Sequence, residues 1–370
     1  MKKLWDKFVY FMAWLALIWT VISSCVLAVV IIRHSIYRAM IYRPSSPEPS
    51  GSFPVQPEWA FTAQEAVNCT PVVEDSLVFI NTEHKLYAIS VEEGVEVWQL
   101  EHPTSTRCPY ASAEVLVLPN QKGAIDAYDT KTGRPMWHDT FEKERAIYED
   151  AVIFWENKVF VSRTFSFLTC YDLQSGSVLW EQETLGHTSV PLAAGDGVLY
   201  MGMRNSVYAY DAHQGQPLWV EDFGETVHEL QLQASQLYVN SITALVAYDV
   251  VQRQIVWKTP LPERANTQND LLLAEDKLYL STDRILALSR SHGSILWESE
   301  VSPHNLGPMV ILGESLFARD NENALYRVER TNDHGIIGKL LVKPVAESPV
   351  AAGDLLIVPF GDGRVFAYQP

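Results

Sequence analysis

The stretch AYDTKTGRPMW, residues 127–137, places a Gly four residues before a Trp, and related stretches recur along the chain. Five other copies end at a Trp: AISVEEGVEVW at Trp98, CYDLQSGSVLW at Trp180, AYDAHQGQPLW at Trp219, AYDVVQRQIVW at Trp257 and ALSRSHGSILW at Trp297. If Trp59 is included, successive tryptophans are 38 to 43 residues apart. A period of this size indicates one structural unit per repeat.

Each repeat also contains a strand pattern of the form hydrophobic-x-Ala-hydrophobic, or a close variant of it. The eight copies are LYAI (86–89), IDAY (125–128), LTCY (168–171), VYAY (207–210), LVAY (245–248), ILAL (285–288), LYRV (325–328) and VFAY (365–368). Short runs rich in Val, Leu and Tyr precede them and are separated by turn residues, which predicts a small antiparallel meander in each unit. The sequence therefore predicts an all-β, eight-bladed β-propeller of four-stranded blades over residues 58–370.

The two ends of the repeat array complement each other. Trp59 precedes the first strand pattern, whereas the last pattern, VFAY, ends two residues before the C-terminus. We therefore expect the segment at Trp59 to supply the outer strand of the last blade. Such pairing closes the ring and removes two exposed sheet edges.

The turn before each Trp has a structural explanation. The Asp accepts backbone hydrogen bonds, the Gly adopts a positive φ, and the strand places the Trp where the neighbouring blade covers it. The predicted docking tryptophans are Trp59, Trp98, Trp137, Trp180, Trp219, Trp257 and Trp297. The predicted turn glycines are Gly94, Gly133, Gly176, Gly215 and Gly293. An exposed aromatic ladder for bases or sugars is the alternative, and the regular phase of the repeat favours the structural interpretation.

Two repeats depart from the pattern. Arg253 replaces the Gly of the fifth turn, which predicts a different turn conformation there. Lys339 stands where the Trp of the seventh unit is expected, 42 residues after Trp297. We therefore expect the seventh blade to form the least regular junction.

The N-terminal region is the one strongly apolar part of the chain. Residues 8–32 carry no charge, and 25 residues are enough to cross a hydrocarbon core of ~30 Å as a helix. We expect a short tail at 1–7, one transmembrane helix at 8–32 and a Pro/Ser-rich linker at 33–57. A cleaved signal peptide would have a shorter apolar run. ISSC at 22–25 also resembles a relaxed lipobox that would place a lipid on Cys25, but the apolar continuation argues against it.

Charge restricts the partners. The 370 residues contain 28 basic and 45 acidic side chains, and beyond residue 43 the balance is 22 basic to 44 acidic. A surface this acidic repels the phosphate backbone of nucleic acids. We therefore expect no nucleic-acid partner. Three basic residues flank the apolar segment on each side, so charge alone does not predict its orientation in the membrane.

The AxDxxTGxxxW pattern resembles the tryptophan-docking repeat of the pyrroloquinoline quinone (PQQ)-like β-propellers, and residues 127–137 match it in full. The resemblance covers residues 59–368. WD-type propellers have a similar period, but no Trp-Asp dipeptide belongs to the repeat in this chain. The resemblance implies the fold and leaves two functional classes open.

One branch of that family, the BamB-like branch, implies a membrane-tethered, non-catalytic scaffold of outer-membrane assembly. The other branch, the quinoprotein dehydrogenases, implies PQQ and calcium in the propeller and oxidation of alcohols or sugars. Those enzymes are longer, and many of the alcohol dehydrogenases carry a vicinal Cys pair against the quinone. This chain has blades of near-minimal length and no adjacent Cys pair, so we expect no cofactor.

The remaining chemistry-bearing residues form no recognisable catalytic or metal-binding pattern. The ten histidines are dispersed, and the four cysteines show no metal-ligand spacing. Cys69 and Cys108 each follow a docking Trp by ten residues, so a disulfide between adjacent blades is one hypothesis. RDNENALY, residues 319–326, resembles a calcium loop, although a polar hairpin turn explains it equally well and is favoured.

We therefore expect a non-enzymatic scaffold that docks protein partners in the cell envelope. The family resemblance implies that the propeller lies on the periplasmic or extracellular side of the membrane. The alternative is a quinoprotein oxidoreductase, with PQQ and calcium, or a small-ligand sensor that uses the central channel. A third reading is an architectural domain of an envelope complex with no separable ligand.

Overall fold

The computed structural model describes residues 56–102, 107–120, 123–140, 152–163, 167–184, 191–262, 270–282, 284–299, 306–320, 322–330, 337–340 and 345–370. The chain divides into two compact units, Met1–Pro47 and Glu48–Pro370. The predicted tail, the predicted anchor at 8–32 and Cys25 lie outside the described residues, as does nearly all of the linker. Within the described ranges, no helix is long and apolar enough to span a membrane.

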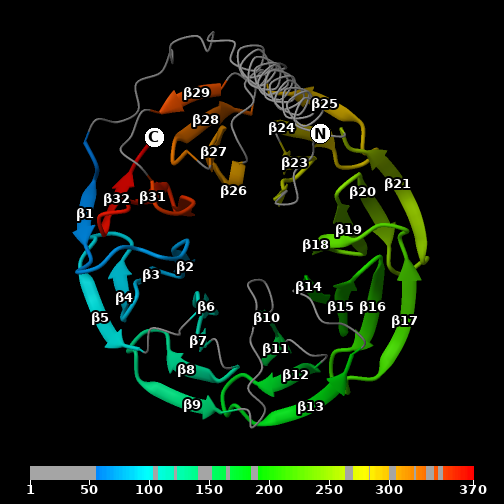
Figure 1. Cartoon of the computed structure of the whole chain (residues 1–370), viewed down its shortest axis with the longest axis horizontal. Coiled ribbons are helices and arrows are strands. Elements are labelled where there is room, and N and C mark those ends of the chain that lie inside the picture. Colours follow the sequence, from blue (N-terminus) through cyan, green and yellow to red (C-terminus); the bar gives the residue numbers. More distant parts are fainter. Residues whose placement is uncertain are drawn as a thin grey trace, which may run out of the picture. The chain divides into compact units, whose positions relative to one another are not determined.

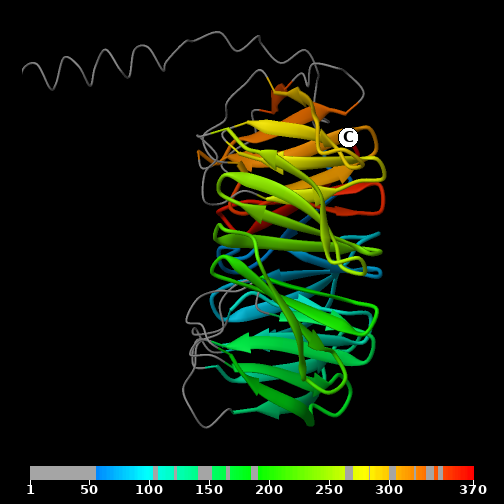
Figure 2. The ribbon, with the colours of Figure 1, turned by 90° about the vertical axis from the view of Figure 1, so that its right-hand side faces the viewer.

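The second unit is a ring of eight antiparallel sheets of four strands each (Figure 1). We number the blades along the chain, and in blades 1–7 the strands follow one another from the centre outward. Seen from the side, the strands run across the ring from one face to the other (Figure 2). The predicted all-β, eight-bladed propeller is therefore confirmed.

The strands of the first four blades have the following bounds. Blade 1 contains β2 (Val72–Glu74), β3 (Leu77–Asn81), β4 (Lys85–Ser90) and β5 (Glu96–Glu101). Blade 2 contains β6 (Tyr110–Ala111), β7 (Val115–Pro119), β8 (Ile125–Asp129) and β9 (Pro135–Asp139). Blade 3 contains β10 (Val152–Trp155), β11 (Lys158–Arg163), β12 (Phe167–Asp172) and β13 (Val178–Glu183). Blade 4 contains β14 (Leu192–Gly195), β15 (Val198–Met203), β16 (Ser206–Asp211) and β17 (Pro217–Asp222).

The remaining blades complete the ring. Blade 5 contains β18 (Val227–Gln233), β19 (Gln236–Ser241), β20 (Ala244–Asp249) and β21 (Gln254–Pro260). Blade 6 contains β22 (Leu271–Leu273), β23 (Lys277–Ser281), β24 (Ile285–Ser289) and β25 (Ile295–Glu298). Blade 7 contains β26 (Leu306–Leu312), β27 (Ser315–Asp320), β28 (Leu325–Glu329) and β29 (Ile337–Leu340). Blade 8 contains β30 (Val350–Ala352), β31 (Leu355–Pro359), β32 (Arg364–Tyr368) and β1 (Trp59–Thr62).

Blade 8 joins the two ends of the propeller. β1 pairs antiparallel with β32, and the register places Trp59 opposite Ala367 and Thr62 opposite Arg364. The segment at Trp59 therefore supplies the outer strand of the last blade, as the sequence predicted. The closed ring leaves no blade with a missing strand and gives β32 a hydrogen-bonded neighbour on both sides.

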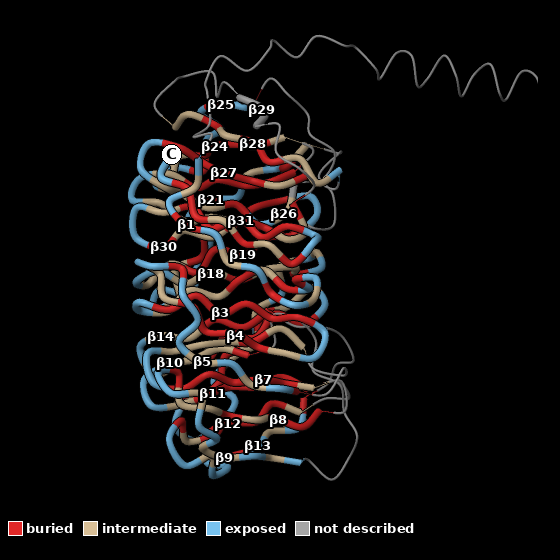
Figure 3. Tube along the Cα trace, turned by 90° about the vertical axis from the view of Figure 1, so that its left-hand side faces the viewer, coloured by how far each residue is buried: buried red, intermediate tan, exposed pale blue. Residues whose placement is uncertain are grey.

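The core lies between the blades because each sheet is covered on both faces by its neighbours. β3 and β7 are buried along their whole length. Val78 and Ile80 of blade 1 pack with Ile357 and Val365 of blade 8 in one apolar cluster. Exposed residues gather at the turns on the two faces of the ring (Figure 3). Strands buried on both faces explain why the sequence shows apolar runs beside the alternating segments.

A β-bulge precedes the docking Trp in the outer strands of blades 1–6. In blade 3, Trp180 pairs with Cys170 and Val178 pairs with Tyr171, so Leu179 has no residue opposite it. The equivalent bulge residues are Val97, Met136, Leu218, Val256 and Leu296. A bulge re-aims the next side chain, which here is the docking Trp.

Blade 7 is paired differently, and the expectation that Lys339 occupies the docking position is wrong. In blade 6, Trp297 lies opposite Ala287, and the equivalent of Ala287 in blade 7 is Arg327. The residue opposite Arg327 is Gly338, and β28 and β29 pair over their described residues without a bulge. Counting residues from the sequence assumed the extra residue of a bulge, so it placed the docking position one residue too far along the chain.

Candidate interaction surfaces of the ring

The junction between blades 3 and 4 shows how a docking Trp is held. Trp180 is 9% exposed, and its indole Nε1 donates to the carbonyl of Ala212 over 3.2 Å. Its ring lies 5.8 Å, centroid to centroid, from that of Phe160 in its own blade. Gly215 of blade 4 has a φ of +72°, and a Cβ there would lie 2.6 Å from the Trp180 ring. The position therefore requires Gly both for its backbone conformation and for the close approach of the ring.

Four other predicted pairs share this geometry. The indoles of Trp59, Trp98, Trp137 and Trp257 donate to turn carbonyls of the next blade over 2.8, 2.9, 2.9 and 3.0 Å. A Cβ at Gly94, Gly133, Gly176 or Gly293 would lie 2.4, 2.8, 2.4 or 2.4 Å from the facing ring. Trp297 is also buried, and the turn that would face it in blade 7 lies largely outside the described residues.

The Asp of the turn acts as expected from its chemistry. The Asp129 Oδ1 accepts hydrogen bonds from the backbone N–H of Thr132 over 2.8 Å and from its hydroxyl over 2.6 Å. Asp172 makes the same pair of contacts with Ser175. The hydroxyl hydrogen bond is the main cause that lowers the pKa of each carboxyl. The carboxylate form therefore helps to fix the turn that faces the preceding Trp.

The junction between blades 4 and 5 is built differently. Arg253 stands in place of Gly and has a φ of +56°. Its guanidinium carbon lies 5.4 Å from the centre of the Trp219 ring. Trp219 is only partly buried, with ring centroids of Tyr200 and Tyr248 at 5.8 and 6.0 Å. A cation over an aromatic face thus occupies the place where a bare glycine faces the ring elsewhere.

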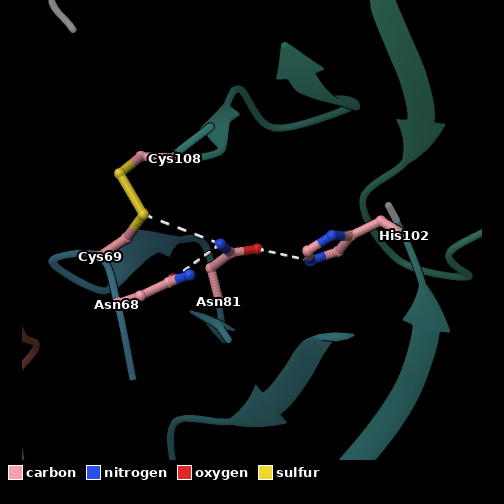
Figure 4. The surroundings of a disulfide bond; sticks show 5 residues. All are labelled: Asn68, Cys69, Asn81, His102 and Cys108. Atoms are coloured by element: carbon pink, nitrogen blue, oxygen red, sulfur yellow. Dashed lines mark hydrogen bonds between the residues drawn. A yellow bond between two sulfur atoms is a disulfide. The ribbon is translucent and has the colours of Figure 1, made fainter. Parts of the chain in front are cut away.

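Cys69 and Cys108 form a disulfide between the inner ends of blades 1 and 2 (Figure 4), with Cα atoms 5.6 Å apart and a sequence separation of 39. Asn81 lies beside it, and its Nδ2 donates to Asn68 Oδ1 over 2.9 Å. On the other side, Asn81 Oδ1 lies 3.0 Å from His102 Nε2 (Figure 4). Asn81 and His102 are buried, so this polar network is part of the blade rather than an open site.

Cys170 is a free, buried thiol opposite the docking Trp180. It occupies the position that Ala holds in the other Trp-bearing blades. Burial raises the pKa of this thiol to about 12, so it stays protonated at neutral pH. A buried protonated thiol is a packing residue and a poor nucleophile.

Two carboxylates tie the inner strands of blades 5, 6 and 7 together. The Glu229 Oε2 accepts from the backbone N–H of Leu271 in blade 6 over 2.9 Å. Asp270 Oδ2 in turn accepts from the backbone N–H of Met309 in blade 7 over 2.9 Å. Burial, and then the nearby charge of Asp270, raise the pKa of Glu229 to about 8. The Glu229 side chain therefore carries a proton over much of the neutral range.

A buried ion pair crosses the junction between blades 2 and 3. The Arg163 side chain is fully buried, and its Nη2 lies 3.0 Å from Asp139 Oδ2. The Tyr171 hydroxyl also donates to Asp139. Arg163 Nη1 donates to Thr169 Oγ1 over 2.7 Å. All three nitrogens of the guanidinium have protein partners, since Nε donates to the Gly123 carbonyl over 3.4 Å, so the cluster holds two blades together.

Among the described residues, no group of three or more His, Cys, Asp or Glu side chains could hold a metal ion. In the segment 319–326, Asp320 accepts backbone hydrogen bonds from Glu322 and Ala324 and one from the Tyr326 hydroxyl. Those contacts are those of a polar hairpin turn. A cavity of about 380 Å³ between blades 1 and 2 is lined by turn residues that include Glu74, Asp75 and Lys131.

The geometry shows that the protein is an eight-bladed propeller of PQQ-like repeats, in which docking tryptophans join neighbouring blades. The family model described as "Outer membrane protein assembly factor BamB" matches residues 56–221, 122–271 and 203–370. The chain therefore belongs to this family.

The similar proteins include BamB relatives and an enzyme. The outer membrane protein assembly factor BamB of Yersinia pestis is 22% identical over 320 residues, 76% of this chain and 79% of that protein. The crystal structure of BamB from Moraxella catarrhalis has a TM-score of 0.66 at 15% identity and covers 85% of this chain and 99% of its own. The quinohemoprotein alcohol dehydrogenase of Comamonas testosteroni also has a TM-score of 0.66, at 13% identity, over 85% of this chain and 76% of its own. At such identities the two structures show the fold alone.

The sequence did not predict the contacts that Glu229 and Arg163 make between blades. Glu229 stands in the strand VHELQLQ, where its spacing shows nothing unusual. Its partner is a backbone N–H 42 residues away in another blade. Arg163 was missed for the same reason, since Asp139 lies 24 residues before it. An acidic or basic residue inside an otherwise apolar strand is the one signal that could have pointed to them.

Proposed function

We propose that this protein is a non-catalytic scaffold that docks protein partners in the cell envelope, held at the membrane through residues 8–32. The family match over nearly the whole propeller carries the proposal. The assembly role named for the relatives supports it. The blade architecture agrees with it, because the unusual side chains Cys170, Arg163 and Glu229 are used for packing and for joining blades.

The second candidate is a quinoprotein, and the structural neighbour from Comamonas testosteroni is the observation in its favour. The residues present do not fit a quinone held against a vicinal cysteine pair. Cys69 and Cys108 bridge two blades, and Cys170 lies under a docking Trp. We therefore derive no reaction through PQQ for this chain.

The test compares the two functions on the full chain in its native membranes. Mild crosslinking followed by mass spectrometry is expected to recover defined envelope proteins in stoichiometric amounts. In parallel, the detergent-purified chain is titrated with PQQ and Ca²⁺ by calorimetry and assayed for dye reduction with alcohols and sugars. Heat of binding with turnover would replace the scaffold by the quinoprotein, and the scaffold predicts neither.

A further inference from the structure

The outer turn of blade 5 differs from its counterparts at the position of Val251. The equivalent residues in the other Trp-facing turns are all polar: Glu92, Lys131, Gln174, His213 and Ser291. Val251 is 77% exposed, the highest value among the large apolar residues that are exposed in the described structure. Two residues later, Arg253 stands where the other five turns have Gly.

The outer strands of several blades expose apolar side chains, and at blade 5 the turn adds Val251 to them. On the same blade, the outer strand β21 exposes Ile255 and the bulge residue Val256. On blade 4, the adjacent outer strand β17 exposes Leu218 and Val220. The contact of Arg253 with the Trp219 ring brings the blade 5 turn against β17. We call these five apolar residues the blade 4–5 patch.

The fold itself does not need this arrangement. A β-branched side chain at the tip of a turn gains nothing from exposure to water. A left-handed conformation is costly for a residue with a Cβ, and the neighbouring junctions avoid that cost with Gly215 and Gly293. The same turn therefore carries two unfavourable choices, and the first of them, the exposed Val251, becomes favourable if another surface covers it.

The charged residues near the blade 4–5 patch indicate which kind of partner would cover it. The side chains of seven outer strands are described. Among these strands, only β21 carries a lysine, Lys258, and β21 contains no carboxylate. Lys258 is 43% exposed, and its contact to Glu225 is long, at 3.7 Å. Arg253, in the turn, and Lys258, in β21, thus stand on either side of Ile255 and Val256 in the chain.

The carboxylates beside the patch already have partners. Glu221 of β17 accepts a hydrogen bond from the Tyr248 hydroxyl over 3.2 Å. Asp222 accepts from the Asn205 side chain over 2.7 Å and from the backbone N–H of Gly224 over 2.7 Å. The guanidinium of Arg253 and the ammonium of Lys258 remain exposed beside these carboxylates, on a chain whose formal net charge is -17.

We propose that the blade 4–5 patch docks a segment of a partner protein that is apolar and carries carboxylates. The apolar side chains of that segment cover Val251, Ile255 and Val256, and its carboxylates face Arg253 and Lys258. This inference rests on the proposed scaffold function and assigns it a surface.

The test places a photocrosslinking residue, p-benzoylphenylalanine, at Val251 of the full chain in its native membranes. Matched controls carry the same residue at Lys131 or Gln174, the equivalent turn positions of blades 2 and 3. The crosslinked peptide is then sequenced by mass spectrometry. We expect one peptide of another protein, apolar and with at least two carboxylates, at a yield ten-fold or more above that of the controls.

The other outcomes overturn the inference. A crosslink from Val251 to a second copy of this chain, to lipid or to a basic segment assigns the patch to a different occupant. Crosslinks to a partner from Lys131 or Gln174 and none from Val251 leave the scaffold in place and remove the patch from it. No protein crosslink from any of the three positions contradicts the patch, while the proposed scaffold function is judged separately by the membrane crosslinking described above.

A double variant separates docking from folding. Val251→Lys with Arg253→Gly gives the blade 5 turn the residue types of its counterparts. We expect an unchanged or higher thermal midpoint together with at least a ten-fold loss of the partner peptide, crosslinked in this case from p-benzoylphenylalanine at Gln252. Retention of the crosslink at full yield would overturn the proposal.

Discussion

Two neighbouring junctions of the ring solve the same packing problem in different ways. Between blades 3 and 4, Trp180 is buried against Gly215, donates to Ala212 and admits no Cβ at the glycine. Between blades 4 and 5, Trp219 is partly exposed beneath the guanidinium of Arg253. The regular junction packs a glycine directly against the ring, whereas the irregular one places a cationic side chain over the ring and carries the exposed Val251 in its turn.

The difference indicates where the fold leaves room for change. Blade 5 retains other connections to the ring: Trp257 docks onto blade 6, and Glu229 binds a backbone N–H of the same blade. A single junction can therefore lose its Gly without loss of the ring. Function in such a repeat protein is expected where one copy departs from the others without a structural reason.

The largest difference between the two junctions should appear when each Trp is removed. Trp180→Ala deletes a buried ring and its hydrogen bond, and we expect a loss of about 3–5 kcal/mol in the free energy of unfolding. Trp219→Ala should cost less, because that ring faces the flexible Arg253 side chain, which can fill part of the vacated space, rather than a glycine backbone. Chemical denaturation of both variants measures the difference, and equal losses would contradict the comparison.

The disulfide gives the junction between blades 1 and 2 a covalent link, so the stability of this junction can be compared with that of the two junctions above. Cys69→Ser should lower the free energy of unfolding by about 2–4 kcal/mol, because the unfolded chain loses a crosslink across 39 residues. Thermal unfolding under non-reducing conditions measures it. Cys170→Ser is the matched control for loss of a thiol: it keeps the disulfide and should lose stability in added reductant as the parent chain does, whereas Cys69→Ser should not respond to reductant.

Gly215→Ala tests the close contact at the regular junction alone. The new Cβ would lie 2.6 Å from the Trp180 ring and would occupy a φ of +72°. We expect a cost of about 2 kcal/mol, of which roughly 1–2 kcal/mol comes from the backbone conformation. Gly224→Ala, with φ +78° and open space around the added Cβ, is a control that isolates the backbone contribution.

The pH dependence tests the inner tie of blade 5. The pKa of Glu229 is raised to about 8, so its contribution to stability is complete below about pH 4.5 and is lost as the pH rises toward 8. Between these values the free energy of unfolding should fall with rising pH on account of this group. Glu229→Gln should remove that slope, whereas Glu181→Gln, on an exposed position of β13, should leave it. An unchanged slope in Glu229→Gln would show that the tie does not titrate as argued.

The sequence was sufficient for the parts of the fold that each repeat carries within itself. The Trp, Gly and Asp of one turn are local, and the phase of Trp59 against VFAY predicted the closing strand. The position of Gly338 opposite Arg327 could not be predicted, because the bulge is one extra residue that the spacing does not reveal. Glu229 and Arg163 act across blades, on partners that only the closed ring brings near.

The patch was only half visible in the sequence. Arg253 stood out as a missing glycine, but Val251 acquires meaning only when the six turns are superposed and its exposure is known. Comparison of equivalent positions in a repeat protein is therefore a direct route to its functional surfaces.

The most direct test of the account is a reciprocal exchange of Gly215→Arg and Arg253→Gly, each measured by thermal unfolding. The account predicts opposite signs: a clear drop in the midpoint for Gly215→Arg, and an unchanged or higher midpoint for Arg253→Gly. A comparable drop in both variants would show that Arg253 is required by the fold, and would contradict the claim that this junction departs from the others for the sake of binding.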